Sequence, residues 1–221
     1  VYYSRKQFKK AKGTEIGENI LLDLFSKNGF TIISPEQLTL DEQIAVVRNT
    51  KLLCGIIGTL GHNMLFAKPE QHMILVNKTH NINVAQMDIN KMKNLDMTYI
   101  DSYLAEFPSL IGNGPFLITY SEMLNQYVEK HNWKKPAEDV ISETVLKRNL
   151  QEYEEMYRSR NLKNLRLVYE KNPDRFDYFA PDHLLELEMR FYHLEHPATM
   201  REKIFYQYNR VKRAFRRIVK R

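Results

Sequence analysis

The chain has 221 residues, of which 43% are hydrophobic and 27% are charged. This length and composition suit one domain, or a domain with an extension, that buries a sizeable core. The single cysteine, Cys54, excludes an internal disulfide framework and a zinc site built from several cysteines. Because the chain starts at Val1 and leads directly into an apolar run, we expect it to be a piece of a longer protein.

The positive charge is concentrated at the C-terminal end. Residues 201–221 hold nine Lys and Arg against one Glu, a net charge of +8. The whole chain carries +6, so the first 200 residues sum to −2. A body without an excess of basic residues is not typical of a nucleic-acid-binding domain. We therefore do not expect nucleic acid as a partner of the body, and the tail is a separate question.

The first third of the chain alternates patterns typical of strands and of helices. Four short apolar runs predict strands, at residues 1–3, 30–33, 52–57 and 73–76. Apolar spacing predicts helices over 15–27 and 62–67, and Thr39 and Glu42 have the spacing of a capping box at the start of another. Strands and helices in this alternation predict an α/β fold with a Rossmann-like open parallel sheet.

The middle of the chain has weaker signals. Residues 97–103 are rich in residues that favour strands and predict one more. Residues 119–131 predict a helix with Met123, Tyr127 and Val128 on its inner face.

The strongest local signal is the segment Gly55-Ile-Ile-Gly58-Thr59-Leu60-Gly61-His62-Asn63. It lies where a predicted buried strand ends and a helix begins, the place where open α/β sheets bind ligands. Glycines let the backbone approach a ligand closely, and a helix N-terminus offers N–H groups to a phosphate. The alternative is a tight turn whose glycines serve packing, with His62 or Asn63 as the helix cap. The segment has neither the dinucleotide-binding nor the P-loop fingerprint, which argues against both of those functions.

Polar residues follow two other predicted strands. Ser4 and Arg5 come directly after the first strand, where a guanidinium is suited to bind a phosphate with two hydrogen bonds. Pro35 and Glu36 follow the second strand, with Gln43 beyond them, and a carboxylate there is suited to accept the hydroxyls of a ribose. The alternatives are a solvated basic loop in the first case, and a turn with a helix cap in the second.

Other patterns of residues carry little chemistry. His193 and His196 are three apart, but no third metal ligand accompanies them. Cys54 lies inside a predicted strand, where a thiol serves packing more often than catalysis. The sequence has no Asp-x-Asp pair of the kind that holds a metal-bound sugar nucleotide.

These segments together occur in the order found in one enzyme family. The residues are Tyr3-Ser4-Arg5, Asn28-Gly29-Phe30, Ile33-Ser34-Pro35-Glu36, Leu38-x-Leu40-x-x-Gln43 and Gly55 through Phe66. Over about residues 1–77, the chain resembles the conserved half of the family 61 glycosyltransferases of the capsular polysaccharide biosynthesis type. The resemblance implies a GT-B architecture, in which two Rossmann-like domains face each other across a cleft. This chain is similar to the C-terminal, donor-binding domain.

The resemblance also implies an activity: inverting, metal-independent transfer of a sugar from a nucleotide-sugar, usually a UDP-sugar, without a cofactor. The acceptor would be a polysaccharide, a lipopolysaccharide or another glycan. Arg5 would neutralise the pyrophosphate, the Gly58–Asn63 turn would cradle it, and Pro35, Glu36 and Gln43 would lie near the base and ribose. The acceptor site and the catalytic base would belong to a missing N-terminal domain, so no catalytic residue is assigned.

One departure from the family pattern bears on the biological setting. Plant and animal members typically have His-Gly-Ala-Gly in this turn, whereas in this chain the histidine, His62, follows the glycines. The difference leaves the individual role of His62 open and favours a bacterial polysaccharide or lipopolysaccharide pathway.

From about residue 137 the pattern is helical almost throughout. We predict a Rossmann-like, nucleotide-sugar-binding domain over 1–135 and a helical extension over 136–221 that ends in a basic amphipathic helix. The tail's apolar face comprises Ile204, Phe205, Tyr208, Val211, Phe215, Ile218 and Val219. Such a helix suits an anionic membrane surface, or it packs on the body with its basic face in solvent, or it binds nucleic acid or another acidic partner.

Two other functions remain open at this point. The first is a non-catalytic α/β module that associates with a membrane surface or a partner protein through its basic C-terminal helix. The second is another nucleotide-using enzyme of the same fold, such as a sugar-nucleotide epimerase, against which the missing fingerprints count. We expect a cytoplasmic protein, peripheral on the inner face of the bacterial membrane if the tail binds lipid.

Overall fold

The computed structural model describes residues 1–7, 14–81, 83–105, 107 and 112–161, together with residues 200, 204, 207, 208 and 211. The chain divides into two compact units, Val1–Tyr153 and Glu154–Arg221. The predicted boundary after residue 135 separates functional domains, whereas this division separates units by their geometry. The predicted boundary therefore stays a prediction.

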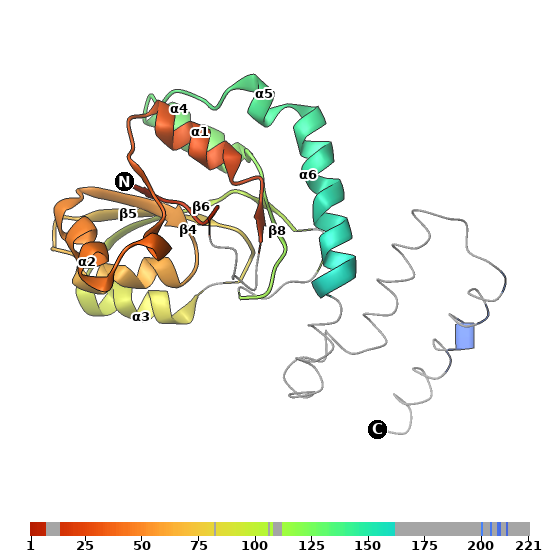
Figure 1. The fold of residues 1–221 in the computed structure, drawn as a ribbon, viewed down its shortest axis with the longest axis horizontal. Helices are drawn as coiled ribbons and strands as arrows, with labels where there is room; N and C mark the ends of the chain where they lie inside the picture. The colour runs from red at the N-terminus through yellow and green to blue at the C-terminus, as the bar shows by residue number, and fades with distance from the viewer. Residues whose placement is uncertain are drawn as a thin grey trace. The chain divides into compact units, whose positions relative to one another are not determined.

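A parallel sheet forms the centre of the first unit (Figure 1). Its five strands in the described residues are β1 (Tyr2–Tyr3), β3 (Ile32–Ile33), β4 (Leu52–Ile56), β5 (His72–Asn77) and β6 (Asp96–Asp101). Their spatial order is β3-β1-β4-β5-β6. The chain passes from β1 outward to β3 and then returns to β4 on the other side of β1, which makes a topological switch point between β1 and β4. The predicted α/β fold with a Rossmann-like open parallel sheet is confirmed.

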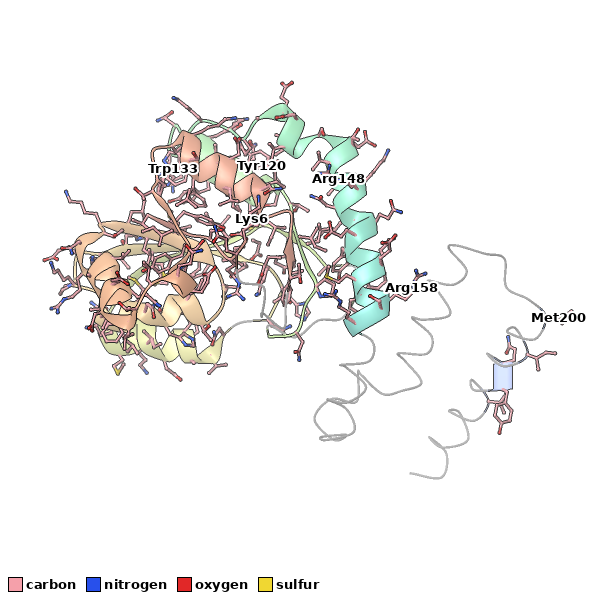
Figure 2. All side chains as sticks on the ribbon, viewed as in Figure 1. Lys6, Tyr120, Trp133, Arg148, Arg158 and Met200 are labelled. Carbon is pink, nitrogen blue, oxygen red and sulfur yellow. The ribbon has the colours of Figure 1, made fainter. Side chains whose placement is uncertain are left out.

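Helices cover both faces of this sheet, which explains why its central strands are apolar throughout (Figure 1). One face is covered by α1 (Asn19–Lys27) and α4 (Glu122–Lys130), and the other by α2 (Leu40–Asn49), the 3₁₀-helix η2 (Thr59–Phe66) and α3 (Val84–Lys93). Cys54, Ile74 and Val76 belong to the first core, whereas Met73 and Leu75 belong to the second. Side chains fill the space between the sheet and its helices (Figure 2).

The predicted capping box is present at the start of α2. The hydroxyl of Thr39 accepts the N–H of Glu42 at 3.3 Å, and the Glu42 carboxylate accepts the N–H of Thr39 at 2.7 Å. A short 3₁₀-helix, η1 (Pro35–Gln37), precedes it. The predicted helix over 62–67 is η2, which begins three residues earlier, at Thr59.

A second, smaller sheet corrects the prediction for residues 15–27. Its strands are β2 (Glu15–Ile16), β7 (Tyr103–Leu104) and β8 (Phe116–Ile118), in the order β2-β8-β7. The predicted helix is therefore wrong at its first turn, and α1 begins only at Asn19. The cause lies at Gly17, whose φ of +87° interrupts a helix and where a Cβ would meet the Ile118 carbonyl oxygen.

The helix predicted over 119–131 is α4, but one of its predicted inner residues faces solvent. Met123 is 54% exposed, whereas Val128 is fully buried and Leu124 takes the inner position next to Met123. The predicted strand over 97–103 is divided between β6 and β7.

The helical pattern predicted beyond residue 137 is present as far as the structure describes the chain continuously. It comprises α5 (Glu138–Ile141), α6 (Glu143–Met156) and a π-helical turn (Tyr157–Asn161). Residues 200, 204, 207, 208 and 211 are also helical. The predicted pair His193 and His196 lies outside the described residues.

Candidate functional site

The predicted site residues gather at the carboxyl end of the parallel sheet, around its switch point. Ser4 and Arg5 follow β1, Gly58 follows β4, and Lys78 follows β5. A Cβ built on Gly58 would lie 3.6 Å from Arg5 Nη1, so the guanidinium lies beside the turn between β4 and η2. Two segments separated by more than fifty residues thus meet where doubly wound sheets bind ligands.

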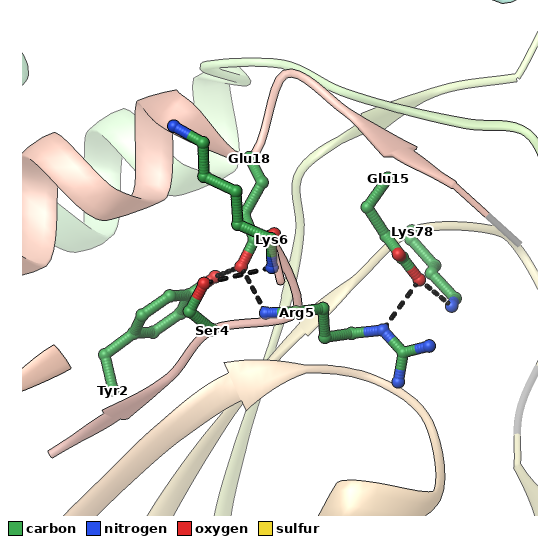
Figure 3. Close-up of polar contacts among 7 residues, drawn as sticks. All are labelled: Tyr2, Ser4, Arg5, Lys6, Glu15, Glu18 and Lys78. Atoms are coloured by element: carbon green, nitrogen blue, oxygen red, sulfur yellow. Dashed lines mark hydrogen bonds and ion pairs between the residues drawn. The ribbon is translucent and has the colours of Figure 1, made fainter. Parts of the chain in front are cut away.

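Arg5 belongs to a buried charge cluster (Figure 3). Glu15 Oε1 lies 3.0 Å from Arg5 Nε and accepts a hydrogen bond from Lys78 Nζ at 2.6 Å. The exposed fractions of these side chains are 13% for Arg5, 4% for Glu15 and 3% for Lys78. Burial lowers the pKa of Lys78, and the Glu15 carboxylate opposes that shift. One carboxylate thus serves two cations, which leaves these three side chains with a net positive charge.

A second carboxylate, Glu18, fixes the backbone of the loop after β1. Its Oε1 accepts the Arg5 N–H at 2.8 Å and the Tyr2 hydroxyl at 3.1 Å (Figure 3). Burial raises the pKa of Glu18, while hydrogen bonds from Arg5, Ser4 and Tyr2 act in the opposite direction. Because Glu18 immediately precedes α1, these contacts tie the end of β1 to the start of that helix.

The two glycines of the β4–η2 turn have different surroundings. Gly58 has extended backbone, which any residue can adopt, and its neighbour Arg5 Nη1 is at an ordinary contact distance. At Gly61, a Cβ would lie 2.4 Å from Gln86 Oε1 and 3.4 Å from Leu75 Cδ1. The packing alternative therefore accounts for Gly61, whereas Gly58 has no packing requirement and borders Arg5.

The polar residues of η2 are held by neighbouring elements. The Asn83 amide nitrogen lies 3.2 Å from His62 Nε2, and its oxygen caps α3, so His62 Nε2 is the acceptor. Asn63 Nδ2 donates to Gln43 Oε1 at 3.0 Å. Gln43 Nε2 in turn donates to the carbonyl of Pro35 at 2.9 Å. These hydrogen bonds join the turn after β4 to the turn after β3.

The remaining predicted residues differ in exposure. Glu36 and Thr59 are exposed, and Leu60 is half-buried. Ser4 is 3% exposed, and its hydroxyl accepts the N–H of Lys6 at 3.1 Å. The structure thus brings the predicted residues to one edge of the sheet, and their binding of a ligand stays a prediction.

Sequence reasoning missed Lys78 and Glu15. Lys78 directly follows a predicted strand, as Arg5 does, so the same rule applied to the strand at 73–76 would have found it. Glu15 carries no such signal, because it lies in β2, a strand that forms only by pairing with the distant β8.

The described residues give little support for a reactive cysteine, a metal site or a membrane span. Cys54 is buried in β4, and burial raises the pKa of its thiol. No group of three or more His, Cys, Asp and Glu among the described residues is placed to hold a metal ion. Within the same residues, no helix has the length and apolar character needed to cross a membrane.

The open parallel sheet and its switch-point loops define a Rossmann-like α/β domain. The family model described as Glycosyltransferase 61 matches residues 1–74, about a third of the chain. Over that segment the chain is similar to the glycosyltransferase family 61, and the resemblance inferred from the motifs is confirmed. The match includes every predicted site residue and ends before Lys78. No curated protein and no solved structure matches the chain.

Proposed function

We propose that this chain is the donor-binding part of a glycosyltransferase that uses a nucleotide-sugar, specifically a UDP-sugar. The observation that carries the proposal is the position of Arg5, whose guanidinium lies beside the Gly58 turn at the switch point of the sheet. A fixed guanidinium at that place is suited to a diphosphate. The family match supplies the sugar-transfer chemistry over the same residues.

In this proposal the charge that develops on the leaving diphosphate is stabilised by two groups. Arg5 contributes a permanent cation, and the first turn of η2 contributes N–H groups that have no partner within a 3₁₀-helix. Electrostatic stabilisation of this kind is usually the largest single contribution to catalysis. The base and ribose would lie toward Pro35, Glu36 and Gln43, the last of which is joined by a hydrogen bond to Asn63 of the turn.

The proposal extends to the rest of the reaction. The transfer is inverting and needs no metal ion, and the acceptor is a polysaccharide, lipopolysaccharide or other glycan, in a soluble or lipid-linked form. A further, N-terminal domain would supply the acceptor site and the catalytic base. Residues outside this chain would then complete the active site, and the chain alone would bind the donor without transferring the sugar.

Thermal unfolding with and without nucleotides tests this proposal. At about 100 times its dissociation constant, UDP stabilises the folded chain by roughly 2.7 kcal/mol, which raises Tm measurably. We expect this shift with UDP and UDP-sugars, its persistence in EDTA, and its loss in Arg5→Ala. Arg48→Ala, which removes an exposed arginine on α2, is the matched control and keeps the shift. A shift with NAD alone, or none with any uridine nucleotide, contradicts donor binding.

One observation favours a second function for the tail. Met200, Ile204, Tyr208 and Val211 are helical, and between 63% and 74% of each is exposed. Their spacing places them on one face of a helix. We propose that this face, with the basic residues of 201–221, associates with an anionic membrane surface. It would bring the donor-binding domain to a lipid-linked acceptor.

A further inference from the structure

We propose that Lys78 is a positioning residue for the diphosphate site: its ammonium neutralises the Glu15 carboxylate, which would otherwise repel an anion bound beside Arg5. The inference rests on the proposed donor binding and adds a residue outside the matched segment of residues 1–74. It is carried by the shared contact of Arg5 and Lys78 with Glu15 (Figure 3).

The geometry assigns different parts of Arg5 to different tasks. Its Nε faces Glu15 at 3.0 Å, while its Nη1 lies toward Gly58. The ion pair with Glu15 thus engages the Nε side of the guanidinium, and Nη1 lies beside the turn. Glu15 is therefore suited to hold Arg5 in the orientation that a phosphate beside Gly58 requires.

A carboxylate in this position also has an electrostatic cost for anion binding. With Arg5 and Glu15 alone, the pair would be neutral, and the Glu15 charge would repel a phosphate across a poorly screened, buried distance. Lys78 removes this problem, because its ammonium lies 2.6 Å from the same carboxylate oxygen. The three side chains then carry one net positive charge.

The surroundings of Lys78 fix it in this place. Its side chain is 3% exposed, and Nζ lies 4.2 Å from the centroid of the Phe116 ring. Phe116 belongs to β8, the strand that pairs with β2 and thereby places Glu15. A buried lysine is costly to desolvate, so its position against Glu15 and an aromatic face indicates a specific electrostatic role.

The test compares two ligands that differ only in charge. UDP and uridine are titrated into the full chain and into Lys78→Met, and the dissociation constants are measured by calorimetry. We expect Lys78→Met to weaken UDP binding by about tenfold or more, because the Glu15 charge is then uncompensated. Uridine, which lacks phosphates, should bind as to the unmodified chain. Lys135→Met, which removes a lysine paired with Glu129 on the surface, is the matched control.

Two further variants keep the test valid if Lys78→Met does not fold. The double variant Glu15→Gln with Lys78→Met removes both charges and again leaves one net positive charge on Arg5. It should bind UDP within about threefold of the unmodified chain, since the net charge is restored. Glu15→Gln alone removes the negative charge beside Arg5 and should bind UDP at least as tightly as the unmodified chain.

Several results would overturn the inference. They are unchanged UDP binding in Lys78→Met, equal weakening of UDP and uridine in that variant, or tenfold weaker UDP binding in Glu15→Gln or in the double variant. In each of these cases the unmodified chain still binds UDP, so the proposed function stands. If the unmodified chain binds neither ligand, both the inference and the proposed function are refuted.

Discussion

Glu18 is a buried, hydrogen-bonded carboxyl group whose titration makes the stability of the folded chain depend on pH. It is 5% exposed and accepts the N–H of Arg5 and the hydroxyl of Tyr2. Burial nevertheless raises the pKa of its carboxyl above the usual 4.5. Between the usual value and the raised one, the folded chain binds more protons than the unfolded chain. The stability contributed by Glu18 is therefore present at low pH and is lost as the pH rises through its folded pKa.

Glu18→Gln is expected to remove this pH dependence. The glutamine has nearly the same volume, and its oxygen still accepts the hydrogen bonds of Arg5 and Tyr2, but it carries no charge to desolvate. The variant should therefore become more stable relative to the unmodified chain as the pH rises. Urea denaturation of both chains from about pH 4 to about pH 8 measures the difference.

A control variant and a contrary result complete the test of this prediction. Other titrating groups are common to both chains, so they cancel in the difference between them. Glu36→Gln changes an exposed carboxyl at the same edge of the sheet and should show no such trend. A stability difference between Glu18→Gln and the unmodified chain that stays constant with pH would refute the assignment of the shift to burial.

At the scale of elements, the two glycines of the β4–η2 turn are expected to have different roles. Gly61 serves packing, and Gly58 borders the proposed phosphate site. Gly61→Ala should destabilise the chain by about 1–3 kcal/mol, because the new Cβ overlaps Gln86 Oε1. Gly58→Ala meets only Arg5 Nη1 at 3.6 Å in extended backbone and should change stability by no more than about 1 kcal/mol. Its methyl group nevertheless occupies the space proposed for a phosphate, so UDP affinity should fall. Chemical denaturation and UDP titration of the two variants measure these effects.

The control for this pair is a double variant. Gly61→Ala combined with Gln86→Ala removes the overlapping oxygen and should recover stability relative to Gly61→Ala alone. Equal stability losses in the two single glycine variants would show that the turn has one role rather than two. So would a loss of UDP binding confined to Gly61→Ala.

Elements with a strong local pattern could be predicted from the sequence. The apolar runs of β4 and β5 and the capping box of α2 depend on neighbouring residues, and each is where it was expected. β2 could not be predicted, because it exists only through pairing with β8, a hundred residues away. In α4, Leu124 and Met123 are equally apolar, so only packing against β6 decides which is buried.

For the whole molecule, the alternation of strands and helices was enough to predict the sheet, and the sheet was enough to bring Arg5 to the Gly58 turn. Parallel strands joined by helices have their carboxyl ends at one edge, so residues after different strands meet there. The charge cluster of Arg5, Glu15 and Lys78 could not be predicted from the sequence, because Glu15 contacts Lys78 from a second sheet. A site's position thus follows from topology, whereas its charge balance follows from contacts between sheets.

The uneven charge of the chain leads to a prediction for membrane association. Residues 201–221 carry +8 and the first 200 residues −2, so attraction to an anionic surface should reside in the tail. Each basic residue near such a surface contributes about 1 kcal/mol, and the exposed face of Ile204 and Tyr208 adds apolar burial. The chain should sediment with vesicles containing phosphatidylglycerol, and a variant ending at residue 200 should not.

Two controls separate charge from apolar contact in this experiment. Vesicles of phosphatidylcholine alone have no anionic surface and should retain much less protein. Ile204→Asn with Tyr208→Asn leaves every charge in place, so weaker sedimentation of that variant would assign part of the binding to the apolar face. If the shortened variant sediments as well as the full chain, the tail is not the membrane-binding segment, whereas the proposal of nucleotide binding at the switch point is unaffected by that result.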